Sequence, residues 1–191
     1  MNIRFAKISD AQSLLEIYSQ YIESAITFEY VIPSKLELEK RIENIIEMYP
    51  YLVYEKDGKI FGYAYARKYM ERAAYQWNVE ISIYLDKSIL SNGFGKKLCA
   101  VLIEILKLQG VKTVYSLITS PNVKSEKMHL SLGFKGVGMY HKAGYKNGGW
   151  YDVAIYEKKI GDYSANPHPV ISIKEIDYSV IEKIINDFYS I

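Results

Sequence analysis

A glycine-rich turn is the first segment of the chain whose residue types could do chemistry. Gly93-Phe94-Gly95-Lys96-Lys97 lies between a predicted strand and a predicted helix. Glycines let the backbone come close to a ligand, and the free N–H groups that open a helix can hold an anion, typically a phosphate. The same pattern can also be only a tight connection, because its spacing is that of neither a P-loop nor a Rossmann fingerprint.

Three polar residues, Asn122, Ser125 and His129, form a second group. Their spacing places them on one face of a helix. A polar stripe on a helix that packs against a sheet is expected to face a cleft. The alternative is an ordinary solvated face with a surface histidine.

Glu80 is the third candidate. It lies in a predicted strand among the apolar residues Trp77, Val79, Ile81 and Ile83, where a carboxylate is normally avoided. Burial raises the pKa of a carboxyl group and suits it to act as a general base. Alternatively, Glu80 points to solvent from the wet face of an antiparallel strand, together with Ser82 and Tyr84.

Periodicity and turn signals predict the elements that position these residues. The segments 9–12 and 34–37 are predicted capping boxes, each opening an amphipathic helix. Asp57-Gly58 predicts the turn of a hairpin that spans residues 51–66. Further strands are predicted at 2–7, 75–85, 111–118 and 150–158, and further helices at about 95–109 (closed by Gly110), 123–131 and 177–190.

The resulting order, β-α-α-β-β-β-α-β-α-β, predicts an α/β fold with a mixed sheet covered by helices. We expect one domain over residues 1–161, followed over 162–191 by a linker and a C-terminal helical extension. The apolar stripe of the last helix, from Val180 to Phe188, must be buried on the domain or on a partner subunit.

The composition excludes several functional classes. The 191 residues include 24 basic and 22 acidic ones, a net charge of +2, so we expect no nucleic-acid partner. Cys99 lies in an apolar run and is expected to be a buried spacer, and no Cys/His spacing indicates a metal site. The first residues form no hydrophobic signal region, and no apolar stretch approaches the ~18 residues of a membrane span. We therefore expect a cytoplasmic protein without membrane contact. The unusual count is 19 tyrosines.

The three groups together resemble the acetyl-CoA core of the GNAT N-acetyltransferases. In that family a central strand leads into an R/Q-x-x-G-x-G/A turn, and a later helix reads N-x-x-(small)-x-x-x-Y before L-G-F. Here the turn is Leu90 to Gly95, and the helix runs from Asn122 to His129 before Leu132-Gly133-Phe134. Leu90 replaces the usual Arg or Gln, and His129 stands where the family often has a tyrosine.

A stronger resemblance, over about residues 3–160, is to the phosphinothricin and methionine sulfoximine acetyltransferases. The most specific matches are the strand Trp77-Asn78-Val79-Glu80 and the segment from Ala143 to Val153. Other ordered pieces are Ile17-Tyr18, Thr27-Phe28-Glu29, Tyr49-Pro50, Gly62-Tyr63-Ala64-Tyr65-Ala66, Arg72-Ala73-Ala74-Tyr75 and His129.

This resemblance implies roles for individual residues. Glu80 is the expected base, and His129 is a second acid/base group whose order of action stays open. For acetyl-CoA the implied binding residues are Ser82, Ile83, Tyr84, Leu85, Gly93, Phe94, Gly95, Lys96, Asn122 and Ser125. For the acceptor they are Phe28, Arg72 and Tyr75.

The implied activity is transfer of the acetyl group of acetyl-CoA to the α-amino group of a small amino acid or amino-acid analogue. The resemblance also implies a homodimer. One alternative is a different acceptor amine, such as a polyamine or a protein N-terminus. The other is a non-catalytic acyl-CoA-binding regulatory domain, against which the presence of both Glu80 and His129 argues.

Overall fold

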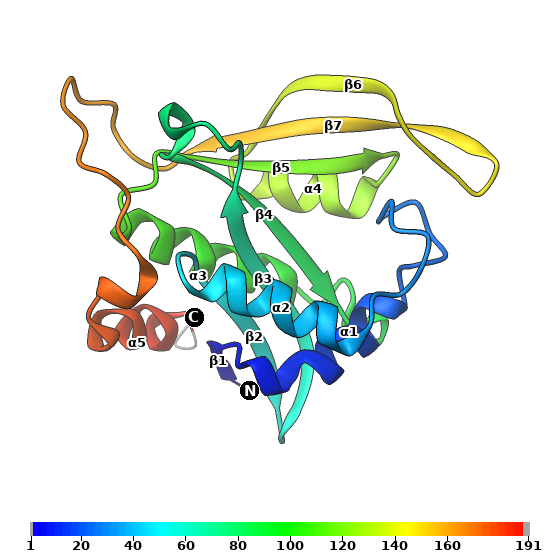
Figure 1. The fold of residues 1–191 in the computed structure, drawn as a ribbon, viewed down its shortest axis with the longest axis horizontal. Coiled ribbons are helices and arrows are strands. Elements are labelled where there is room, and N and C mark those ends of the chain that lie inside the picture. The colour runs from blue at the N-terminus through cyan, green and yellow to red at the C-terminus, as the bar shows by residue number, and fades with distance from the viewer. Residues whose placement is uncertain (1, 189–191) are drawn as a thin grey trace.

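A seven-stranded mixed sheet runs through the molecule in the computed structural model, which describes residues 2–188 (Figure 1). The strand order is β1-β2-β3-β4-β5-β7-β6. Neighbouring strands are antiparallel except for β4 and β5, which are parallel. The strands are β1 Asn2–Phe5, β2 Tyr51–Lys56, β3 Lys59–Lys68, β4 Asn78–Leu85, β5 Thr113–Ser120, β6 Lys135–Lys146 and β7 Gly149–Lys159.

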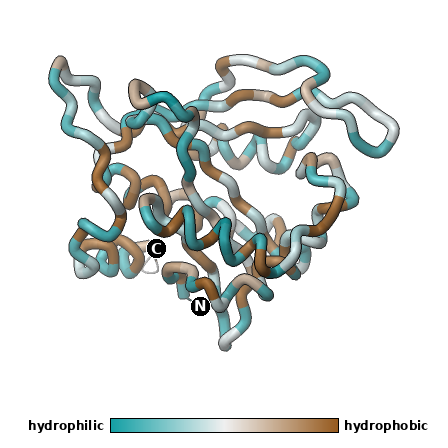
Figure 2. The backbone as a smooth tube through the Cα atoms, in the orientation of Figure 1, coloured by the Kyte–Doolittle hydropathy of each residue, from teal (hydrophilic) through white to brown (hydrophobic). Residues whose placement is uncertain are grey.

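Helices cover both faces of this sheet. They are α1 Ala11–Ser19, α2 Lys35–Ile46, α3 Phe94–Leu108, α4 Val123–Ser131 and α5 Tyr178–Asp187. Alternate residues of a strand point to opposite faces, so Tyr51 and Val53 pack with α1 and α2, whereas Leu52 packs with α3. Figure 2 shows hydrophobic segments along the central strands and along α3. The predicted α/β class with a helix-covered mixed sheet is confirmed.

Three local predictions are confirmed in detail. Ser34 begins α2 by accepting a hydrogen bond from the Glu37 N–H, and the Glu37 carboxylate accepts one from the Ser34 N–H. Asp57 and Gly58 both have positive φ, as the hairpin turn between β2 and β3 requires. Cys99 is fully buried, and burial raises the pKa of its thiol to about 12, as expected of an inert spacer.

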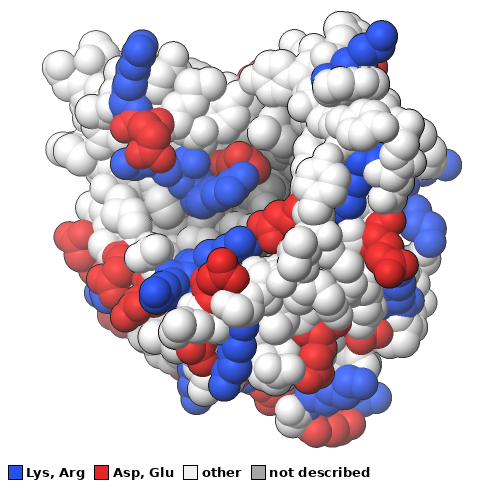
Figure 3. Space-filling view, turned by 45° about the vertical axis from the view of Figure 1, so that its right-hand side comes forward, with Lys and Arg blue, Asp and Glu red and all other residues white. Residues whose placement is uncertain are grey.

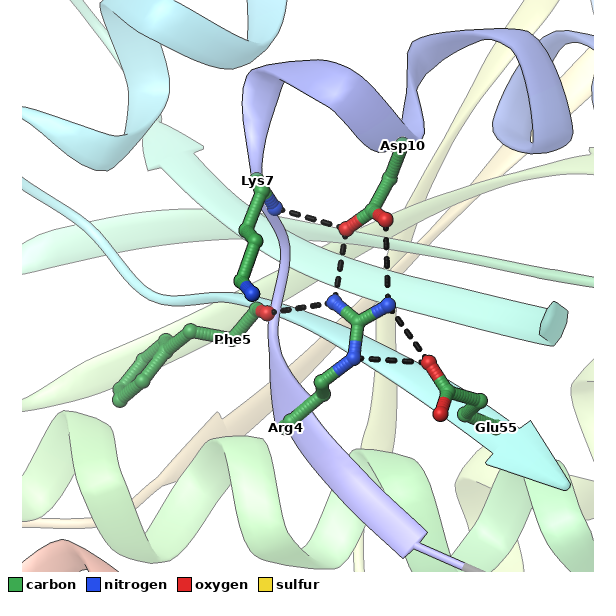
Figure 4. A network of polar contacts seen from close by, with 5 residues as sticks. All are labelled: Arg4, Phe5, Lys7, Asp10 and Glu55. Carbon is green, nitrogen blue, oxygen red and sulfur yellow. Dashed lines mark hydrogen bonds and ion pairs between the residues drawn. The ribbon is translucent and has the colours of Figure 1, made fainter. Parts of the chain in front are cut away.

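The first predicted capping box is wrong. Asp10, not Ser9, precedes α1, and the Asp10 side chain makes no cap to that helix. Its carboxylate instead accepts hydrogen bonds from the Arg4 guanidinium and the Lys7 N–H, and Arg4 also binds Glu55 (Figure 4). The network ties β1 and β2 to the start of α1.

Strand β6 is missing from the predicted order. Its residues are exposed except for Gly144 and Lys146, because it lies at the edge of the sheet and pairs only with β7. It also carries register shifts at Gly136/Gly138 and Tyr140/Gly144. An exposed, irregular strand has no alternation of apolar and polar residues, so periodicity does not reveal it.

The C-terminal extension packs on the domain. Helix α5 buries Ile181 and Ile185 in the core that also contains α3, and Val170 and Ile173 join the same core. The Gln109 amide at the end of α3 donates to the carbonyls of Met48 and Ile171 at 2.7 and 2.8 Å. The predicted end of α5 at residue 190 lies outside the described residues. None of the helices within residues 2–188 has the length and apolar character that a membrane span needs.

Candidate active site

The site begins where β4 and β5 separate. The two strands pair only from Asn78/Thr113 to Glu80/Tyr115, although β4 continues to Leu85 and β5 to Ser120. Figure 1 shows the strands starting side by side and then diverging. The edge of β4 beyond Glu80 therefore has no β5 partner, and its backbone groups on that side are available to a ligand, except the Leu85 carbonyl, which accepts from the Tyr21 hydroxyl.

One cavity, the α3–α4 cavity, of about 530 Å³ lies along this edge. It is bordered by β4, by the glycine-rich turn and by α4. Most of the residues predicted to bind acetyl-CoA line it: Ser82, Ile83, Tyr84, Leu85, Gly93, Gly95, Lys96, Asn122 and Ser125. The catalytic candidate His129 lines it as well.

The glycine-rich turn shapes one end of the α3–α4 cavity. Gly93 has φ of 80° and is the N-cap of α3, so the N–H groups of the first helical turn are presented at the cavity. A Cβ on Gly95 would lie 3.1 Å from Leu85 Cδ1 and 3.2 Å from Met128 Sδ, which shows how closely the turn packs. The Phe94 ring instead contacts the ring of Tyr54 in the core, so Phe94 can contribute only backbone groups.

Helix α4 places the His129 ring in the opposite wall. Asn122 begins this helix by accepting a hydrogen bond from the Ser125 N–H. The Ser125 carbonyl lies 2.9 Å from His129 Nδ1, and because a carbonyl only accepts, Nδ1 carries the proton. His129 Nε2 is buried and has no hydrogen-bond partner among residues 2–188. Burial lowers the pKa of His129, against the opposing effect of the Ser125 carbonyl, so the ring is neutral with a free lone pair on Nε2.

A second cavity, of about 590 Å³, lies on the α1–α2 side of the sheet. We call it the tyrosine cavity because five tyrosines line it: Tyr18, Tyr51, Tyr63, Tyr65 and Tyr84. Its charged lining consists of two pairs, Arg67 with Glu80 at 2.8 Å and Arg41 with Glu29 at 2.7 Å. On the face drawn in Figure 3, basic and acidic side chains are likewise interspersed around a hollow, without a continuous patch of either charge.

The two cavities meet at the separation of β4 and β5. Five residues line both: Ile26, Ser82, Tyr84, Leu117 and Thr119. Glu80 lines only the tyrosine cavity and His129 only the α3–α4 cavity. The structure thus places the two catalytic candidates on either side of a shared boundary.

The acceptor-binding candidates are divided. Phe28 lines the tyrosine cavity. Arg72 and Tyr75 lie in the exposed connection between β3 and β4, where Arg72 precedes the short helix Ala73–Tyr75. Neither residue lines either cavity, so the structure does not bring these two to the other candidates.

These features can be compared with known proteins. A model of the acetyltransferase (GNAT) domain matches residues 3–155. The chain belongs to the GNAT acetyltransferase family. It is 33% identical over 177 residues to the phosphinothricin N-acetyltransferase of Streptomyces viridochromogenes, covering 92% of this chain and 96% of that protein. It is 28% identical over 167 residues to the L-methionine sulfoximine/L-methionine sulfone acetyltransferase of Salmonella typhimurium, covering 86% and 98%.

A solved structure agrees with this assignment. The GNAT phosphinothricin acetyltransferase from Sinorhizobium meliloti, in complex with AcCoA, has a TM-score of 0.82 and 32% identity, covering 88% of this chain and 92% of that one. The predicted family and fold are therefore confirmed. This GNAT protein is an acetyl-CoA-dependent N-acetyltransferase. Its described residues hold no group of three His, Cys, Asp or Glu side chains that could bind a metal ion.

The α3–α4 cavity of this GNAT enzyme fits acetyl-CoA chemically. The free edge of β4 offers extended backbone to a chain of amides, and the start of α3 offers N–H groups to a pyrophosphate. Lys96 adds a positive charge beside that turn. The His129 ring borders the same space, and its buried Nε2 has no hydrogen-bond partner among the described residues.

Two residues of the site were missed from the sequence. Arg67 pairs directly across from Glu80 in the β3–β4 register. Its only signal is that it follows Tyr63 and Tyr65 at two-residue spacing, on the face that Glu80 and Ser82 share. Lys146 is a buried cation in a segment that carried no predicted element.

Lys146 holds the loop that carries Phe28. Its ammonium donates to the carbonyls of Thr27 and Glu29, both at 2.7 Å, on either side of Phe28. The Phe28 ring packs against Gly144, where an added Cβ would lie 2.4 Å from ring carbons. The end of the β6–β7 hairpin therefore positions one wall of the tyrosine cavity.

We expect Lys146→Met to lower the free energy of unfolding by about 1–3 kcal/mol, because two carbonyls lose a buried donor. Urea unfolding measures this effect. Lys135→Met is the matched control, since Lys135 lies exposed on the same strand and should change stability by less than about 0.5 kcal/mol. Equal losses in both variants would contradict the role of Lys146.

Proposed function

We propose that this enzyme transfers the acetyl group of acetyl-CoA to the α-amino group of a small amino acid or amino-acid analogue. The observation that carries the proposal is the meeting of the two cavities at the separation of β4 and β5. One cavity offers backbone groups and a helix start to the coenzyme, and the other presents paired charges to an acceptor. The acceptors named for the two curated relatives, phosphinothricin and methionine sulfoximine or sulfone, support a small amino-acid-like molecule.

In this proposal the α3–α4 cavity holds acetyl-CoA, whose thioester supplies the acetyl group. Along the stretch of β4 from Ser82 to Leu85, the N–H groups of Ile83 and Leu85 point away from β3, and they bind the pantetheine amides and the acetyl carbonyl, where they also stabilise negative charge that develops on its oxygen. Gly93, Gly95, Lys96 and the Phe94 backbone hold the pyrophosphate. Asn122 and Ser125 contact other parts of the coenzyme.

Glu80 is the proposed base. An amino group reaches the site protonated and must lose that proton before it can attack a carbonyl. The Glu80 side chain is 12% exposed, lies in the acceptor-side cavity and is two residues from the shared boundary at Ser82. It therefore lies close to where an acceptor amine meets the thioester.

His129 is the proposed second acid/base group. Its free Nε2 lone pair accepts a proton in the neutral form, which favours a relay that takes up the second amine proton, released after the nitrogen has attacked the carbonyl, over an acid that is protonated at rest. The same ring, once protonated, can pass that proton to the departing sulfur of CoA. Both steps use only Nε2, the ring nitrogen that the Ser125 carbonyl leaves free.

The acceptor-side charges favour a zwitterion over a polyamine. The tyrosine cavity contains two arginines and two glutamates, whereas a polyamine site needs an excess of carboxylates. Phe28 is proposed to line the acceptor site. Arg72 and Tyr75 stay predicted acceptor contacts.

Release of free thiol from acetyl-CoA tests the proposal. We expect turnover with L-methionine sulfone and phosphinothricin, weaker or no turnover with spermidine, and none with an N-terminal peptide. Preference for spermidine or the peptide would replace the proposed acceptor class. No thiol release with any amine would favour a non-catalytic acyl-CoA-binding domain.

We also propose a homodimer in the cytoplasm. The exposed edge of the β6–β7 hairpin carries Val137, Met139, Tyr140 and Trp150, apolar side chains that an interface could cover. Light scattering after size exclusion should give twice the chain mass of 22.1 kDa. A monomer mass would oppose the dimer without affecting the proposed reaction.

A further inference from the structure

Arg67 and Glu80 place two opposite charges side by side in the tyrosine cavity. The two residues are direct partners across β3 and β4, and Arg67 Nη2 donates to Glu80 Oε1 at 2.8 Å. Both side chains line the tyrosine cavity. A positive and a negative group therefore lie side by side, with the carboxylate on the side where the reaction is proposed to occur.

Each member of this pair keeps binding capacity. Within residues 2–188, the Arg67 guanidinium makes no hydrogen bond besides the one to Glu80, so its other N–H groups are free to donate to a ligand. The Glu80 carboxylate likewise accepts from no other side chain of the described residues. The Arg67 side chain is 53% exposed, so a ligand can reach it from the cavity.

The covalent structure of an α-amino acid limits where its carboxylate can bind. Its ammonium and carboxylate are attached to the same carbon, so a group that binds the carboxylate must lie next to the group that receives the amine proton. Arg67 meets this condition because it already contacts Glu80. Arg41 is engaged by Glu29, and Arg72 lies outside both cavities.

We propose that Arg67 binds the α-carboxylate of the acceptor while Glu80 receives the adjacent ammonium, so that the zwitterion replaces the Arg67–Glu80 contact. This inference rests on the proposed function and names the residue that selects for a carboxylate next to the amine. The planar guanidinium suits bidentate contact with a carboxylate, which an ammonium side chain cannot reproduce. The head group then lies with its amine toward Ser82 and the shared boundary.

Paired acceptors that differ only at the carboxylate test this role. L-methionine sulfone has the free carboxylate, and L-methionine sulfone amide keeps the amine and side chain without the negative charge. We expect Arg67→Gln to raise the KM for the acid at least about tenfold, or about 1.4 kcal/mol. The KM for the amide should change less than about twofold, and so should the KM for acetyl-CoA. Arg67→Lys should recover only part of the loss.

The ratio of the KM for the acid to the KM for the amide separates carboxylate binding from indirect effects of the substitution. Removal of Arg67 also frees Glu80, but any effect on the base changes the rate with both acceptors alike. Arg41→Gln is the matched control, since Arg41 lines the same cavity but is engaged by Glu29, and it should not change the ratio more than about twofold. Thermal unfolding of each variant verifies that it folds.

Two results overturn the inference while leaving the proposed function intact. One is that Arg67→Gln affects the acid and the amide equally or not at all while the wild type acetylates the acid. The other is a selective loss for the acid in Arg72→Gln, which would place the carboxylate at the exposed β3–β4 connection. If the wild type acetylates neither compound, the proposed function fails first, and the inference fails with it.

Discussion

Replacement of Glu80 by glutamine is expected to lower kcat about 10²–10⁴-fold, the usual contribution of a general base. Glutamine keeps the size of the side chain and can accept a hydrogen bond, but it cannot take a proton from an ammonium at neutral pH. The KM for acetyl-CoA should stay within about twofold, because Glu80 does not line the α3–α4 cavity. Steady-state kinetics with both substrates varied gives the two values separately.

Glu29→Gln is the matched control for this variant. Glu29 lines the same cavity and also pairs with an arginine, Arg41 at 2.7 Å. It lies in the loop of Phe28 and not on β4, so we expect kcat to change less than about threefold. A Glu80→Gln enzyme that kept more than a third of the wild-type kcat would remove Glu80 from the mechanism.

The second large effect is expected at His129. His129→Gln should lower kcat about 10²-fold, since the amide cannot carry a proton between the amine and the sulfur. His141→Gln is the control, because His141 is exposed and pairs with Asp152 away from both cavities. Turnover within about threefold of wild type in the His129 variant would contradict the relay.

The protonation state of His129 adds a pH signature to this prediction. Burial lowers the pKa of His129 below its ordinary value of 6.5, so the unfolded chain binds the proton more readily than the folded chain does. The stability from the neutral ring is therefore present above about pH 6.5 and is lost as the pH falls below it. Activity should decline at lower pH than this onset, as the pH falls through the lowered pKa of the His129 ring in the folded enzyme. In His129→Gln the difference in unfolding free energy between pH 7.5 and 5.5 should be smaller than in wild type. An unchanged difference would show that His129 does not titrate as described.

Local sequence signals predicted much of the fold. The capping box at Ser34, the Asp57-Gly58 turn and the Gly110 end of α3 each depend on a few neighbouring residues, and each was confirmed. The cap predicted at Ser9 is wrong because Ile8–Asp10 form a short helical turn, in which the Asp10 carboxylate binds Arg4 and Arg4 binds the distant Glu55. Strand β6 was not predicted because an exposed edge strand has no face in the core and so needs no alternation of apolar and polar residues.

The site was predicted only in part, for a related reason. Alternation along β4 placed Glu80, Ser82 and Tyr84 on one face, and helical spacing placed Asn122 beside His129. The point where β4 leaves β5 depends on pairing between strands far apart in the sequence, and so do the Arg67–Glu80 register and the Lys146 contacts. The sequence shows an excess of tyrosines, and the structure shows that five of them line the tyrosine cavity.

The packing of α5 has a consequence for where this chain can be divided. The family match ends at residue 155, yet Ile181 and Ile185 complete the core around α3, and the carbonyl of Ile171 accepts from Gln109. A chain cut after residue 161 would leave that apolar surface in water and take away one of the two acceptors of the Gln109 amide. The packed core thus extends beyond the residues that the family model matches. Expression boundaries for this enzyme belong after α5.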